Sequence, residues 1–148
     1  MDPLSITANV VGITTTCLAT IKALNDLRTK FREAALTLAA ICSESAVISA
    51  TLSRLQSFIM SQERKFLKCF EDRMELVATF DIALLGCVAV FSCLQEEIGR
   101  ITRGMDNPQI GKFGKIKMLW REDVMQELLR QIRCQQVAIS LPIQILQM

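Results

Sequence analysis

The feature that most constrains this chain is a run of nineteen residues without a charged side chain, from Pro3 to Ile21. Asp2 precedes the run and Lys22 follows it. An Asp–Pro pair favours a helix start, because the carboxylate can cap free N–H groups and proline suits the first turn. As a helix the run spans roughly 28 Å, close to the hydrocarbon thickness of a bilayer. The sequence therefore predicts an opening helix that can lie in a protein core and can also enter lipid.

Two patterns within this run bear on its use. Ten of its residues are apolar but five are threonines, which makes it only a moderate transmembrane segment. Ala8, Gly12, Thr16 and Thr20 recur every four residues, so they share one helix face on which another helix can approach closely, in a resting bundle or in lipid. The residues predicted to form a membrane-inserting helix are Leu4, Ile6, Ala8, Val10, Val11, Gly12, Ile13, Thr16, Leu18 and Ile21.

The rest of the chain favours an all-α fold. Its 148 residues, of which 51% are apolar, suffice for one domain with a core. Six glycines and three prolines are few turn residues for a fold with many strands. Apolar residues at steps of three and four predict helices near 3–24, 27–60, 70–103 and 121–141, with a short turn near 65–69. Short connections favour an antiparallel bundle of four long helices plus short helical turns. Residues predicted to be buried are Leu38, Ile48, Leu52, Leu84, Val88, Phe91, Leu128 and Ile132.

Two details of these helices carry their own expectations. Residues 82–95 are uncharged over a length that is typical of a core helix and too short for a membrane span, so this stretch is predicted to be the most buried part of the bundle. Pro142 is expected to end or kink the last helix. The apolar residues after it suggest that the chain, a single domain over 1–148, was excised from a longer protein.

The positive charge is concentrated before the last helix. Between Ile98 and Arg121 there are six basic residues and one acid, a net +5 in a chain of net +2. Basic and aromatic residues in one loop suit anionic lipid headgroups. Nucleic acid fits less well because no helix presents a basic stripe, and a merely solvated loop remains an alternative. The predicted headgroup-binding residues are Lys112, Phe113, Lys115, Lys117, Trp120 and Arg121.

Enzymatic and metal chemistry find little support in the composition. The chain has no histidine, which excludes Ser-His-Asp and Cys-His mechanisms. The six cysteines stand singly in apolar patterns and are predicted to be free, buried thiols with no metal. The glycine-containing segment at 111–115 lacks the spacing of a nucleotide-binding loop, so no cofactor is predicted. Paired carboxylates, Glu71 with Glu75 and Glu96 with Glu97, are expected on solvated helix faces.

Two segments resemble a known family. The opening MDPLSITANVVGI closely resembles the start of many fungal proteins whose N-terminal domain is called HeLo-like. The segment KFGKIKMLWREDVMQELLRQIRCQQVAISL is similar to that family's final part, with a basic loop, a tryptophan, an acidic helix start and a Leu-rich helix. Together they bracket nearly the whole chain, while the middle is recognisable only by its helical pattern.

The resemblance implies a fold, a role and a location. It implies a HeLo-like N-terminal effector domain on a fungal NLR-like (STAND) receptor, ahead of nucleotide-binding and repeat modules. Such domains act in heterokaryon incompatibility and programmed cell death, cytoplasmic at rest and at the plasma membrane when activated, where they self-associate and expose the first helix to the lipid. The alternative is a helical adaptor that binds other proteins while its first helix stays in the bundle. The uncharged first helix favours the effector, although a fully buried central helix would also be apolar all round.

Overall fold

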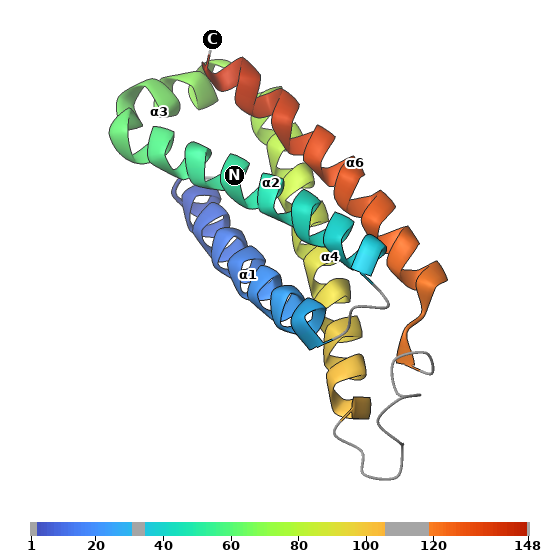
Figure 1. Ribbon diagram of the computed structural model, residues 1–148. Coiled ribbons are helices and arrows are strands. Elements are labelled where there is room, and N and C mark those ends of the chain that lie inside the picture. Colours follow the sequence, from blue (N-terminus) through green and yellow to red (C-terminus); the bar gives the residue numbers. More distant parts are fainter. Residues whose placement is uncertain (1–2, 31–34, 106–118, 148) are drawn as a thin grey trace.

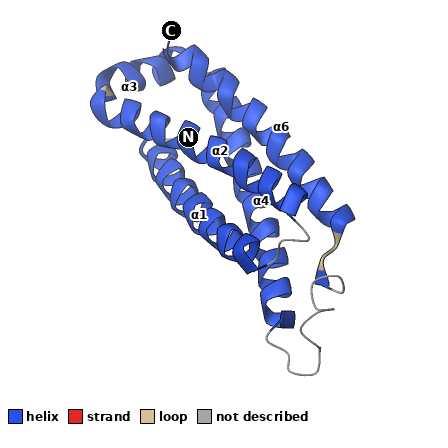
Figure 2. Ribbon diagram, in the orientation of Figure 1, coloured by secondary structure: helices blue, strands red, loops and turns tan. Residues whose placement is uncertain are grey.

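The protein is all-helical over the residues that the structure describes. The computed structural model describes residues 3–30, 35–105 and 119–147, and Figures 1 and 2 show helices joined by short loops in these ranges. No β-strand occurs in the described ranges, as the sequence predicts. The helices are α1 (Pro3–Lys30), α2 (Ala35–Ser61), α3 (Glu63–Asp72), α4 (Met74–Met105) and α6 (Glu122–Gln147).

The four long helices form a ring in which α1 packs on α2, α2 on α6, α6 on α4, and α4 back on α1. Consecutive helices run in opposite directions, so the predicted antiparallel packing holds for α1 with α2 and for α4 with α6. The other two contacts are parallel: Thr37 and Glu122 lie together at the starts of α2 and α6, and α1 and α4 descend side by side in Figure 1. The short helix α3 explains this order, since it carries the chain from the end of α2 across to α4.

Three predicted boundaries are wrong, each for a physical reason. The first helix continues through Asn25 and Asp26 to Lys30, because Leu24 and Leu27 remain on its buried face, and the second helix therefore begins at Ala35 and not near residue 27. The turn expected near residues 65–69 is the helix α3. The last helix continues past Pro142 to Gln147. Pro142 lacks the N–H that would bond four residues back, but its ring is buried beside the equally buried Ile143, and this packing favours continuation of the helix.

The core is a single apolar cluster to which α1, α2, α4 and α6 all contribute. Of the eight residues predicted to be buried, Val88 is the one error, because 44% of it is exposed at the side where α4 meets α1. The seven confirmed residues are Leu38, Ile48, Leu52, Leu84, Phe91, Leu128 and Ile132. The expectation that residues 82–95 form the most buried stretch is also wrong, since Ile82 and Leu85 are largely exposed. Helix α4 therefore buries one face and presents a second apolar face outward.

Candidate functional site

The first helix lies in the ring with one face buried and an uncharged face outward. The residues predicted to insert into membranes divide between the two sides. Val10 and Ile13 are buried, Thr16 and Ile21 are half-buried, and Ala8, Val11, Gly12 and Leu18 are exposed, while the side chains of Leu4 and Ile6 lie outside the described part of the structure. Between Ala8 and Ile21 the helix thus exposes to water an uncharged, largely apolar surface that also includes Asn9 and Thr15.

Most of the described threonine hydroxyls of α1 hydrogen-bond within the helix itself, with Thr16 as the exception. Thr14, Thr15 and Thr20 each donate to the backbone carbonyl four residues back, at 2.7–2.9 Å. The hydrogen bond from α1 to another helix is that of the Cys17 thiol, which donates to the carbonyl of Ser45 at 3.4 Å. No ion pair joins α1 to the rest of the bundle among the described residues. Helix α1 is therefore held in place by apolar packing.

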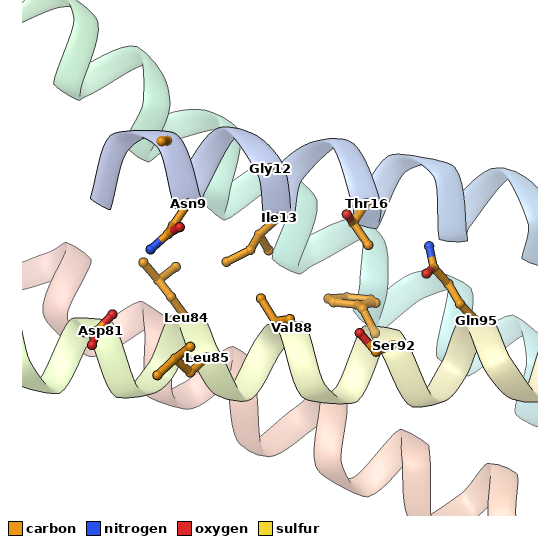
Figure 3. Close-up of a pocket in the computed structure, with 12 residues that line it drawn as sticks. Asn9, Gly12, Ile13, Thr16, Asp81, Leu84, Leu85, Val88, Ser92 and Gln95 are labelled. Carbon is orange, nitrogen blue, oxygen red and sulfur yellow. The ribbon is translucent and has the colours of Figure 1, made fainter. Parts of the chain in front are cut away.

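The small-residue face of α1 forms part of a groove with α4. The expectation that this face packs closely on a neighbouring helix is wrong at Gly12, where an added Cβ would meet no atom within 4 Å. Only Thr20, at the far end of the face, is buried. Figure 3 shows Ile13 and Thr16 of α1 pointing toward α4, and Leu84 and Val88 of α4 pointing toward α1. The groove between them is also lined by Gly12 and has a volume of about 360 Å³.

A polar cluster joins α4 to the start of α6. Glu97 is buried, with only 6% of its side chain exposed, and both arginines beside it contact its carboxylate. Arg100 donates to Glu97 Oε1 from Nη2 at 2.6 Å and also to the carbonyl of Leu119. Arg121 donates to both carboxylate oxygens, from Nε at 3.1 Å and from Nη2. The hydrogen bonds from Arg121 and Arg100 hold the pKa of Glu97 at about 2, although burial opposes the shift.

The same cluster reaches α2 through Glu122. The hydroxyl of Thr37 donates to Glu122, as do the indole of Trp120 at 2.6 Å and the amide of Gln126 at 2.9 Å. These hydrogen bonds, that of Thr37 first, lower the pKa of Glu122. Farther along the same two helices, Arg133 pairs with Glu44 at 3.5 Å. Polar contacts thus join α2, α4 and α6, and α1 takes no part in them among the described residues.

The expectation that Glu97 lies on a solvated face is wrong. Its position in the sequence, next to Glu96 and three residues before Arg100, is equally consistent with an exposed ion pair. The missing partner is Arg121, twenty-four residues away, and only the packing of α6 on α4 brings it to Glu97. The burial of Glu97 could have been predicted from its position as a lone acid on the apolar helix face between Leu94 and Ile98.

The basic loop predicted to bind headgroups falls largely outside the described residues. This holds for Lys112, Phe113, Lys115 and Lys117. The two remaining members, Trp120 and Arg121, are described, and both donate hydrogen bonds to glutamates of the polar cluster. The cluster therefore fixes the point at which the basic loop rejoins the bundle.

The cysteines follow the predicted pattern in part. Cys17, Cys42 and Cys87 are free and buried, and burial raises the pKa of Cys17 to about 11 and of Cys87 to about 12. Cys93 and Cys134 are free but exposed, which corrects the expectation that they are buried. The side chain of Cys69 lies outside the described part. In that described part no three His, Cys, Asp or Glu residues lie close enough together to hold a metal ion.

Two described helices are long and apolar enough to cross a membrane. They are Leu36–Ser61 of α2 and α4, with mean hydropathy of 1.5 and 2.2. Core helices of water-soluble bundles meet the same criterion, so it is weak evidence for a membrane span, and α1 is not one of these two described helices. Comparison with protein families, with curated proteins and with solved structures finds no match to this chain.

Proposed function

We propose that this chain is a HeLo-like effector domain that permeabilises membranes, with α1 as the inserting element. The observation that supports this most is the way α1 is held. Its exposed face is uncharged from Ala8 to Ile21, the hydroxyls of Thr14, Thr15 and Thr20 bond within the helix, and among the described residues no ion pair ties it to its neighbours. A helix of this kind leaves no unpaired charge behind when it leaves the bundle.

The energetics of release depend on where α1 goes. Buried α1 residues such as Val10, Ile13 and Leu24 lose roughly 1.5–3 kcal/mol each when they move into water, so the helix stays docked in solution. Transfer into hydrocarbon restores their apolar surroundings. Because the backbone and the hydroxyls of Thr14, Thr15 and Thr20 are already bonded inside the helix, lipid imposes little further penalty on them. In this proposal the membrane itself makes release of α1 favourable.

The other three long helices stay together when α1 leaves. Among the described residues, their shared polar cluster around Glu97 and Glu122 does not involve α1, so its hydrogen bonds survive the change. The basic residues Lys112, Lys115 and Lys117 then meet anionic headgroups from the loop that this cluster anchors. The remaining features of the proposal rest on the family resemblance: self-association, activation by nucleotide-binding and repeat modules, and a move from the cytoplasm to the plasma membrane in regulated cell death.

A helical adaptor is the second candidate, and one observation favours it. Val137 and Leu141 on α6 are 72% and 62% exposed, next to a surface groove that also includes Glu44 and Arg133 of the α2–α6 contact. An exposed apolar patch with a polar rim is typical of a protein-binding surface. The adaptor would use this α6 surface while α1 stays docked.

Dye release from vesicles separates the two candidates. Leu18→Glu places a charge on the exposed face of α1, where the folded bundle tolerates it, but insertion of an acid into hydrocarbon costs about 3 kcal/mol. We expect the parent chain to release dye from anionic vesicles and Leu18→Glu to release it at least tenfold more slowly. Val137→Glu is the matched control on α6 and should leak like the parent. Equal leakage by Leu18→Glu and parent, or no leakage by the parent, rejects insertion of α1.

A further inference from the structure

The groove between α1 and α4 combines an apolar centre with one unsatisfied acid. Ile13, Leu84 and Val88 form its middle, and Asp81 stands at one end with Asn9 opposite it on α1 (Figure 3). The Oδ1 atom of Asp81 is enclosed by the protein, yet it accepts no hydrogen bond from the described residues. An enclosed carboxylate oxygen without a donor is unfavourable, so a rotation of the Asp81 side chain toward a donor in the groove is favoured.

The size of the groove limits what can occupy it. Its volume of about 360 Å³ lies at the small end of the range for ligand pockets, which runs from about 300 to 1,000 Å³. A single alkyl chain lies naturally between two parallel helices, and Gly12 leaves room for it because no atom lies within 4 Å of where its Cβ would stand.

We propose that the α1–α4 groove binds a free, single-chain amphiphile with a protonated amine, the alkyl chain along Ile13, Leu84 and Val88 and the ammonium on the carboxylate of Asp81. The charge is complementary, since Asp81 is the acid of the groove and no basic residue lines it among the described residues. The ammonium supplies hydrogen-bond donors that this carboxylate can accept.

Binding in this groove has a consequence for α1. The groove exists only while α1 rests on α4, so an occupant binds the docked state and stabilises it by mass action. This consequence rests on the proposed membrane function, whereas the binding itself does not. An amine that fills the groove would therefore slow the release of α1.

The test is calorimetric titration of the whole chain with decylamine, with decanol and decanoate as probes of the same length. We expect one decylamine per chain and binding at least tenfold weaker for both other probes. Asp81→Asn keeps the shape and should lower the decylamine affinity about tenfold. Gly12→Leu fills the groove and should lower the affinity for all three probes. The matched controls, Glu75→Gln on the exposed surface of α4 and Ala19→Leu on α1, should stay within twofold of the parent.

Three results would overturn the proposal. If decanoate binds as tightly as decylamine, or if Asp81→Asn keeps the parent's affinity for decylamine, the Asp81 carboxylate does not recognise the ammonium group. Self-association of the parent that Gly12→Leu abolishes without any amphiphile shows that a second copy occupies the groove. Each variant is first compared with the parent by circular dichroism and thermal melting, and Asp81→Ala replaces any variant that unfolds. These readouts need no membrane, so they are independent of whether the chain permeabilises vesicles.

Discussion

Helix α1 and the junction of α4 with α6 hold to the bundle in opposite ways. Buried apolar side chains and a weak thiol hydrogen bond from Cys17 hold α1. At the junction a buried carboxylate, Glu97, lies between two arginines, and Glu122 gathers three further donors. Apolar side chains are equally favourable in a protein core and in lipid, whereas a buried ion pair is stable only while both partners keep their positions. The comparison indicates that α1 is the separable element and that α2, α4 and α6 form the fixed frame.

Removing apolar packing from α1 should have the largest effect. Leu24 is fully buried, and Leu24→Ala deletes its packing and leaves a cavity, which should lower the free energy of unfolding by about 3 kcal/mol. Hydrogen exchange should rise along α1 more than along α4. The control is Leu18→Ala, whose side chain is 54% exposed and whose loss should change little. Uniform acceleration of exchange in all four long helices would show that α1 is not separable.

Neutralising the buried acid should come next. Glu97→Gln removes the negative charge that contacts both Arg100 and Arg121. Because solvent reaches both arginines, the free energy of unfolding should fall by only about 2 kcal/mol. The melting temperature should fall by roughly 4–8 °C for a chain of this size. Glu127→Gln removes a solvent-exposed ion pair with Arg130 and serves as the matched control, with a much smaller shift. Equal shifts in the two variants would mean that burial adds nothing at Glu97.

The junction should also make stability depend on pH in a defined window. The folded pKa of Glu97 is about 2, below its ordinary 4.5, so its ionised form stabilises the fold. This contribution is complete above about pH 4.5 and is lost as the pH falls towards 2. Urea unfolding between pH 6 and 2 should therefore show a shallower decline for Glu97→Gln than for the parent. Parallel curves would place the acid sensitivity in other carboxylates, such as Glu122.

The smallest effect is expected at Gly12. Glycine within a helix is less favourable than alanine by about 1 kcal/mol, and here the added methyl group meets no atom. Gly12→Ala should therefore raise the free energy of unfolding by up to about 1 kcal/mol in urea titration. The matched variant is Gly86→Ala on α4, where the new Cβ would collide with the side chain of Gln135, so no gain is expected. A destabilised Gly12→Ala would mean that the small-residue face touches another helix after all.

Local sequence patterns predicted the helices but not which helices pack against one another. The spacing of Leu38, Ile48 and Leu52 identifies the buried face of α2, because a helix repeats every 3.6 residues whatever it packs against. The same reasoning failed at Val88, since α4 has two apolar faces and the sequence does not say which one meets the core. The break expected at Asn25 failed because the burial of Leu27 outweighs the local preference for a turn.

The long helices, and the absence of charge over nineteen residues of the first one, can be predicted from the amino-acid sequence alone. Both are properties of one segment at a time. The contact of α4 with α1, the hydrogen bonds from Arg121 to Glu97 and the groove that Gly12 and Asp81 line are seen only in the folded chain. These are relations between residues far apart in the chain. They arise because α3 changes the direction of the chain between α2 and α4. The spacing of apolar residues within one helix does not predict the direction in which the next helix runs.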